Sequence, residues 1–395
     1  MADLSQRLPV TVVTGFLGAG KTTLLRELLL HGGQRLAVLV NEFGEVGIDG
    51  DLLRSCGFCP EEDVDSRLVE LANGCLCCTV QEDFLPTMQQ LLERADQLDG
   101  IVVETSGLAL PEPLLAAFQW PEIRSRTRVN GVVTVVDGEA LASGSVVTDP
   151  AALEAQRAAD PSLDHASAID ELFAEQLECA DLVLVSRSDS LDAHQQQRVR
   201  ERLEPLLRPT TPVLAMERGR IDPAVVLGLE PRSTTTGQHS PADHEQGHAS
   251  DDHDHDHDHD HDHDHDHTHV AMESVALQWT GAFEREPLER ALRQLCLDHS
   301  LIRLKGRLWL KGKARPLVLQ AVGPRFESVF EAEPPTGAST VGAKPLGLEL
   351  VMLGFDLQRR DLPSRLQELL AGTGPGTAPV MPGAIVATGP SAGTA

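Results

Sequence analysis

Residues 15–22 read GFLGAGKT and match the pattern GxxxxGK[ST]. The match lies between an apolar run, VTVVTGF, and a run with helical periodicity that begins at Thr22. In that context the backbone N–H groups of the loop surround a nucleotide's β-phosphate, the lysine reaches the β/γ oxygens and the threonine hydroxyl binds Mg²⁺. A glycine-rich turn that matches by chance is the alternative, and the flanking strand and helix disfavour it. We expect the following nucleotide contacts: Gly15, Gly18, Ala19, Gly20, Lys21, Thr22 and Thr23.

A second apolar run, IVVETSG, places Glu104 at the carboxyl end of a predicted strand and Gly107 three residues later. The N–H of Gly107 is suited to meet a γ-phosphate, and Glu104 is suited to the metal and water network beside it. A helix-capping role for Glu104 is the alternative. Next to the GKT motif, the nucleotide interpretation is favoured, and hydrolysis would release this loop. Lys21, Glu104 and Gly107 are therefore the predicted catalytic residues.

The run ADLVLVSRSD ends where many P-loop GTPases carry the signature Asn-Lys-x-Asp. Asp189 retains the final acid, whose carboxylate can accept both N1–H and N2–H of guanine. Ser186 and Arg187 replace the asparagine and lysine, although the planar arginine can still stack on a base. The sequence therefore predicts guanine, contacted by Ser186, Arg187 and Asp189.

Five of the seven cysteines lie between Cys56 and Cys78. In the segment NGCLCC, Cys75, Cys77 and Cys78 are too close together for one face of a helix or strand, so a turn around a cation is the simplest explanation. With Cys56 and Cys59 upstream, the spacing C-x₂-C-x₁₅-C-x₂-C is also typical of a closed four-cysteine zinc site. A closed structural site and an exchangeable site made by the triplet both remain open on this pattern.

A second metal-binding pattern occupies residues 253–269, where nine histidines alternate with aspartate and one threonine. A charged run of this kind is usually a solvated linker. The density of imidazole groups instead favours a flexible, non-selective collector of transition-metal ions.

The arrangement of apolar runs predicts the organisation of the chain. Up to residue 228, runs of four to six apolar residues alternate with helical patterns, which predicts an α/β, doubly wound, mostly parallel sheet with helices on both faces, the P-loop domain 1–228. Residues 229–271 are expected to be a disordered linker rich in His and Asp. Residues 272–371 predict a smaller α+β domain, and 372–395 a flexible tail of Gly, Pro and Ala.

The composition excludes several classes of protein. The 395 residues include 33 Lys+Arg and 60 Asp+Glu, a formal net charge of −27, so nucleic acid is not an expected partner. No run approaches the roughly 18 apolar residues that a membrane span needs. The start of the chain lacks the pattern of a signal peptide, and clustered cysteines in such a chain indicate metal or redox chemistry. We expect a cytoplasmic protein.

Together, the motifs GFLGAGKTT, NEFGEVGIDG, ELANGCLCC, ETSGLALP and RLKGRLWLKGKARPLVLQAVGPR resemble the CobW family of P-loop GTPases, relatives of nickel chaperones. The resemblance runs from about Pro9 to Leu370, apart from the linker. It implies that the CxCC motif lies beside the nucleotide and releases its metal, so that the site is exchangeable. The metal ligands implied in this way are Cys75, Cys77 and Cys78, with Thr22 and Glu42, and more weakly Asp49, near Mg²⁺ or the metal.

The resemblance also implies a function, a slow GTP-hydrolysing metallochaperone with GTP, Mg²⁺ and Co²⁺ or Zn²⁺. It is strongest to CobW proper, which favours delivery of Co²⁺ to the cobalt chelatase of cobalamin synthesis. The nearest alternative is Zn²⁺ supplied to a client metalloenzyme, and a nucleotide-dependent dimer is among the expected partners. A metal store or sensor that uses the histidine tract also stays open, as does a GTP-dependent assembly switch whose cysteines hold structural zinc.

Overall fold

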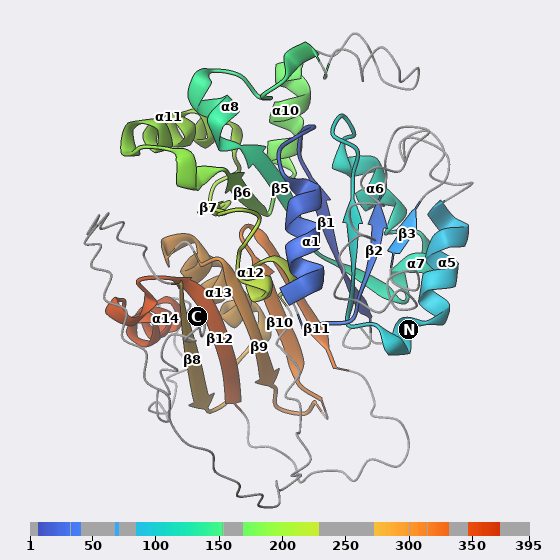
Figure 1. Ribbon diagram of the computed structural model, residues 1–395. Coiled ribbons are helices and arrows are strands. Elements are labelled where there is room, and N and C mark those ends of the chain that lie inside the picture. The colour runs from blue at the N-terminus through green and yellow to red at the C-terminus, as the bar shows by residue number, and fades with distance from the viewer. Residues whose placement is uncertain are drawn as a thin grey trace, which may run out of the picture.

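The computed structural model describes residues 7–31, 33–40, 68–70, 84–151, 153, 169–228, 272–299, 301–313, 315–331 and 347–371. These residues form two sheets, one in each of two domains that lie against each other (Figure 1). None of the helices in the described ranges is long and apolar enough to cross a membrane.

The first sheet has the strand order β3-β2-β4-β1-β5-β6-β7, and all of its pairings are parallel. Every residue of β4 and β6 is buried, which explains why these runs are apolar without alternation. The predicted doubly wound parallel sheet is thereby confirmed. The strand bounds are β1 Leu8–Thr14, β2 Leu36–Val40, β3 Leu68–Glu70, β4 Gly100–Glu104, β5 Thr127–Asp137, β6 Leu182–Ser186 and β7 Val213–Ala215.

Helices cover both faces of this sheet. On one face, α1 packs through Leu24, Leu25 and Leu28 with the short α12 beside it (Figure 1). The other face is covered by α5, α6 and α7 over β1, β2 and β4, and by α8, α10 and α11 over β6. The helix bounds are α1 Lys21–His31, α5 Leu85–Glu93, α6 Pro111–Ala117, α7 Pro121–Arg124, α8 Gly138–Ser143, α10 Ile169–Glu178, α11 Ala193–Leu203 and α12 Pro223–Leu227.

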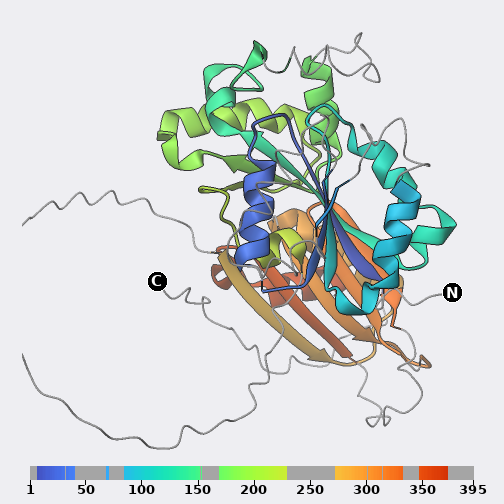
Figure 2. The same cartoon turned by 45° about the vertical axis from the view of Figure 1, so that its right-hand side comes forward.

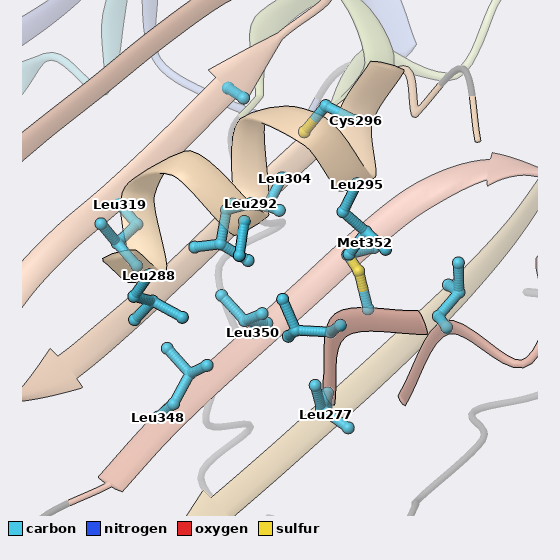
Figure 3. Close-up of a cluster of buried hydrophobic side chains, with 14 of the residues drawn as sticks. Leu277, Leu288, Leu292, Leu295, Cys296, Leu304, Leu319, Leu348, Leu350 and Met352 are labelled. Carbon is cyan, nitrogen blue, oxygen red and sulfur yellow. The ribbon is translucent and has the colours of Figure 1, made fainter. Parts of the chain in front are cut away.

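The second domain is an antiparallel sheet in the order β11-β10-β9-β12-β8 with two helices on one face. Leu288, Leu292 and Leu295 recur at helical spacing on α13 and point at the strands below them (Figure 3). This is the smaller α+β domain that the sequence predicts. Its bounds are β8 Met272–Thr280, α13 Arg285–His299, β9 Arg303–Trp309, β10 Leu317–Val322, β11 Arg325–Phe330, β12 Gly347–Phe355 and α14 Leu362–Ala371.

The second domain contacts the first at the amino-terminal end of β6 and along α12 (Figure 2). Asp181, directly before β6, is fully buried and forms ion pairs with Arg208 of its own domain at 2.9 Å and with Arg325 of β11 at 2.6 Å. Ile302 is buried in the same cluster as α1 and α12. The opposite, carboxyl-terminal edge of the first sheet is where its functional loops begin.

Candidate functional site

The loop between β1 and α1 adopts backbone conformations with positive φ, which glycine permits. Gly15, Gly18 and Gly20 have φ values of 134°, 73° and 103°, a region that other residues rarely adopt. A Cβ on Gly15 would lie 2.0 Å from the carbonyl oxygen of Val135 in the neighbouring strand. Ala19 is buried, with 1% of its surface exposed. The loop therefore has the special backbone geometry that a phosphate-binding turn requires.

Lys21 begins α1 and turns back over this loop. Its side chain is buried, and Nζ donates to the carbonyl oxygens of Gly15 at 2.8 Å and Phe16 at 3.1 Å. The ammonium is thus held within the loop by neutral acceptors, a position in which it can also bind an anion.

Thr22 and Glu104 come together from different elements. Because β4 pairs with β1 in the register Val13↔Glu104, the end of β4 lies beside the loop that follows β1. The Thr22 hydroxyl donates to Oε1 of the buried Glu104 at 3.4 Å. A hydroxyl and a carboxylate are oxygen ligands of the kind that Mg²⁺ prefers, so these residues fit that ion.

Gly107 lies directly against the phosphate-binding loop. A Cβ at this position would be 2.6 Å from the backbone nitrogen of Leu17. On the other side, the fully buried Gln176 of α10 donates from Nε2 to the carbonyl oxygens of Gly107 at 3.2 Å and Ala109 at 3.1 Å. Sequence reasoning did not identify Gln176. The available signal was an amide beside Phe173 and Leu177 on the buried face of α10.

The predicted base-binding residues follow β6. The buried Ser186 donates its hydroxyl to the carbonyl of Val136 at 3.2 Å. Arg187 has a φ of 52°, and its guanidinium donates to the carbonyl of Gly18 at 3.4 Å, which brings it to the phosphate-binding loop. Asp189 is partly exposed and lies 3.9 Å from Arg218. The structure therefore brings Arg187 to the phosphate loop and leaves Asp189 at the surface.

Asp137 holds Arg187 in place, and sequence reasoning did not identify it. It is buried at the end of β5, where one carboxylate oxygen accepts from the backbone N–H groups of Glu139 and Ala140 and caps α8. The other oxygen accepts from Arg187 and from Thr148. An acid that ends an apolar strand at the functional edge of a parallel sheet was the signal for it.

The loop after β7 completes this region and was also missed. The N–H of Met216 donates to Val185 at 2.8 Å, and the Ser188 hydroxyl donates to the carbonyl of Met216 at 3.3 Å. Gly219, with a φ of 80°, has room only for hydrogen, since a Cβ would lie 2.6 Å from Cγ2 of Thr23. The loop is thus fixed between the residues after β6 and the start of α1.

The predicted metal ligands Cys75, Cys77, Cys78 and Glu42 lie outside the described residues, as do Asp49, Cys56, Cys59 and the histidine tract. The described ends of the flanking strands nevertheless indicate where these segments begin. Val40 of β2 pairs with both Glu70 of β3 and Glu104 of β4. β2 and β3 therefore end, at Val40 and Glu70, on the edge of the sheet that carries the phosphate loop.

Within the described ranges, no group of three His, Cys, Asp or Glu side chains could hold a metal ion. Cys179 donates to Glu112 at 2.7 Å, and burial together with that carboxylate raises the pKa of its thiol to about 12. Burial also raises the pKa of Cys296 to about 12. These two thiols therefore stay protonated at neutral pH and are poor metal ligands.

The parallel sheet, its glycine-rich loop and the apposed Thr22 and Glu104 define a P-loop nucleotide-binding protein. Residues 9–215 match the family described as CobW/HypB/UreG, nucleotide-binding domain, and residues 272–370 match the cobalamin synthesis protein cobW C-terminal domain. The chain belongs to the CobW/HypB/UreG family and is a GTP-hydrolysing enzyme. The resemblance found in the sequence is thereby confirmed.

Curated relatives cover nearly the whole chain. The zinc chaperone CobW of Pseudomonas aeruginosa is 44% identical over 369 residues, which are 92% of each chain. The zinc chaperone CobW of Sinorhizobium sp. is 40% identical over 353 residues, 88% of this chain and 93% of that one. Among solved structures, the Zn(II)-bound YjiA GTPase from E. coli is 20% identical with a TM-score of 0.36, over 92% of this chain and 99% of that one.

Proposed function

We propose that this protein is a cytoplasmic, GTP-driven zinc chaperone, which binds Zn²⁺ beside its nucleotide site and delivers it to a client metalloenzyme. The observation that carries this proposal is the 44% identity to a zinc chaperone over 92% of both chains. A second relative of the same name supports it at 40% identity.

The nucleotide roles in this proposal follow from the contacts of the P-loop. Lys21, held inside the loop, binds the β- and γ-phosphate oxygens, and Thr22 with Glu104 holds Mg²⁺. Bound Mg²⁺ supplies neutralisation of the charge that develops on the phosphates. Gly107 offers its N–H to the γ-phosphate, and its contact with Leu17 keeps it close to the loop. The other proposed phosphate-loop contacts are Gly15, Gly18, Ala19, Gly20 and Thr23.

Guanine is the proposed base. Asp189 accepts its N1–H and N2–H, while Arg187, fixed by Asp137 and the carbonyl of Gly18, lies flat against it in place of a lysine. The Ser186 hydroxyl donates to the carbonyl of Val136 and so fixes the start of the same loop. Discrimination against adenine rests on the carboxylate, since adenine lacks both donors.

The cargo site in this proposal is Cys75, Cys77 and Cys78, with Thr22 and Glu42 near Mg²⁺ or the metal. The ends of β2 and β3 at Val40 and Glu70, on the P-loop edge, support a site next to the nucleotide. Thiolates close to a triphosphate repel it unless cations lie between them, so nucleotide and metal should bind cooperatively. Delivery requires the open, exchangeable arrangement rather than a closed four-cysteine knuckle.

Cobalt, the metal that the sequence favoured, is the second candidate cargo, with cobalt chelatase as its client. It is supported by the match of residues 272–370 to the cobalamin synthesis protein cobW C-terminal domain. Thiolates suit both ions, but the Irving–Williams order makes Zn²⁺ the more tightly bound ion, and the two curated relatives are zinc chaperones. Zinc is therefore placed first.

A competition experiment separates the candidates. The full chain, with Mg²⁺ and a non-hydrolysable GTP analogue, is incubated with equal concentrations of Zn²⁺ and Co²⁺, then desalted and analysed for bound metal. A Cys77→Ala variant and a chain that lacks residues 241–269 are treated in the same way. We expect the chain that lacks residues 241–269 to retain one equivalent of Zn²⁺, and Cys77→Ala to retain one equivalent less than the unaltered chain. Retention of Co²⁺ over Zn²⁺ would favour the cobalt candidate. Loss of all metal on deletion, with Cys77→Ala harmless, would indicate a histidine store instead.

A further inference from the structure

A cavity of about 70 Å³ lies between the two domains, at the end of the first sheet opposite the P-loop. Its walls come from β5 through Arg128 and Asn130, from α12 and the residue after it through Ala224 and Gly228, and from the second sheet. A space of this size holds several water molecules or one small ion, since a single water needs roughly 10–15 Å³.

The cavity is strongly cationic. Arg128, Arg303, Lys305 and Arg325 all line it, and Glu327 is the only acidic residue among its described lining. Arg325 is paired with Asp181 at 2.6 Å. The described lining therefore carries more cationic than acidic side chains.

The two guanidinium groups of this lining that are most buried are hydrogen-bonded to neutral acceptors. Arg303, on β9, donates to the carbonyl oxygens of Val225 and Val226 in α12. Arg128 donates to the side-chain oxygens of Gln320 and Asn130. These bonds use some of the five N–H donors of each guanidinium group, and they do not neutralise its charge, which is the costly part of burying an ion.

The pKa of Arg303 reflects the burial of its charge. Burial lowers the pKa of its guanidinium to about 9, Asp181 opposes the shift and Arg128 adds to it. Burial also lowers the pKa of Arg128, against the attraction of Glu327. With a pKa of about 9, Arg303 remains cationic at neutral pH, and an anion beside the two guanidinium groups would offset their repulsion.

We propose that this interdomain cavity binds inorganic phosphate, contacted by Arg128 of the first domain and by Arg303 and Lys305 of the second. Guanidinium groups present planar forks of donors that match the oxygens of phosphate, and lysine adds a point charge. The space of about 70 Å³ is large enough for the free ion. Because its ligands come from both domains, the bound ion links them at a distance from the nucleotide.

Phosphate titration tests the proposal. The full chain is saturated with Mg²⁺ and a non-hydrolysable GTP analogue, so that the P-loop is filled, and inorganic phosphate is titrated by calorimetry at constant ionic strength. We expect one site per chain and a loss of affinity of about tenfold in Lys305→Gln, the effect of one charge-assisted hydrogen bond. Arg307→Gln is the matched control, because Arg307 lies two residues along β9, pairs with Glu331 and does not line the cavity. It should bind phosphate like the unaltered chain.

Two further arms complete the test. Arg128→Gln removes a ligand from the other domain and should weaken phosphate binding as Lys305→Gln does, with circular dichroism to verify folding. Glycerol phosphate, a phosphomonoester, should bind more weakly than phosphate. The proposal is overturned by absent saturable binding in the unaltered chain, by equal weakening in Arg307→Gln, by unchanged binding in a folded Lys305→Gln, or by a phosphomonoester that binds as tightly as the free ion.

Discussion

At the scale of single residues, Gln176 connects the helical layer to the loop that contains Gly107. It is fully buried, and its amide nitrogen holds the carbonyl oxygens of Gly107 and Ala109 at 3.2 Å and 3.1 Å. The loop that follows Glu104 is therefore positioned from α10, whose residues lie about 70 positions later in the chain. Gln176 acts through this loop and is a positioning residue.

Gln176→Leu tests that role. It removes both hydrogen bonds and leaves two buried carbonyls unpaired, at a cost of about 1–3 kcal/mol. If the loop positions Gly107 in the transition state, kcat for GTP falls about tenfold while KM changes little, since tenfold corresponds to about 1.4 kcal/mol. Steady-state kinetics measure this. Gln196→Leu is the control, because Gln196 also donates to a backbone carbonyl, that of Leu191, but on α11. Equal losses in both variants would assign Gln176 a purely structural role.

The cysteines differ in reactivity for a physical reason. Burial raises the pKa of Cys179 and of Cys296 to about 12, so their thiolate fractions are very small at pH 7 and grow about tenfold per pH unit below that pKa. In metal-free protein, iodoacetamide should modify Cys77 at pH 7 long before Cys179, and bound Zn²⁺ should protect Cys77. Peptide mass spectrometry at pH 7 and pH 9 checks this. Alkylation of Cys179 as fast as Cys77 at pH 7 would contradict the raised pKa.

At the scale of elements, the phosphate loop depends on its neighbour β5. Gly15 and Gly18 both have positive φ, but only Gly15 faces a backbone carbonyl, that of Val135, whereas a Cβ on Gly18 meets nothing within 4 Å. A side chain at Gly18 would therefore cause backbone strain alone, whereas a side chain at Gly15 would cause both strain and a steric clash.

Replacing each glycine by alanine should reveal this difference. Both variants incur strain of about 1–2 kcal/mol from the left-handed backbone. Gly15→Ala adds a backbone clash, with a further cost of about 1–3 kcal/mol as in overpacked cores, so its Tm should be several degrees lower than that of Gly18→Ala. Thermal unfolding of the nucleotide-free chain measures the difference. Identical Tm values would mean that β5 does not confine the loop.

The elements and the local motifs could be predicted from the sequence, but several contacts could not. The strands were predictable because burial on both faces makes them continuous apolar runs, and Lys21 with Thr22 belongs to one short pattern. Glu104 was predictable because it ends a strand. Asp137 ends a strand in the same way, so the same signal was available for it. Gln176 and the loop at Met216–Gly219 reach the site only through the packing of distant elements, and a local pattern does not indicate which loop they contact.

At the scale of the whole molecule, β6 runs from the interface between the two domains to the edge of the first sheet that carries the phosphate loop. Asp181 precedes this strand and pairs with Arg325 of the second domain, whereas Ser186 ends it beside the phosphate loop. β2 and β3 also end, at Val40 and Glu70, on the side of the sheet where Ser186 ends β6. In the proposed function, nucleotide and cargo bind at the edge that carries the phosphate loop, whereas the interdomain cavity lies at the other edge.

The most direct test of this account is the affinity for Zn²⁺ in two nucleotide states. A chelator competition is run with Mg²⁺ and a GTP analogue or with Mg²⁺ and GDP, on a chain that lacks residues 241–269, so that the histidine tract does not contribute. Shared ordering of the loops predicts binding at least about fivefold tighter with the GTP analogue, the lower end of allosteric coupling, and its loss in Cys77→Ser. Equal affinity in the two nucleotide states would contradict the central claim that GTP controls the metal site.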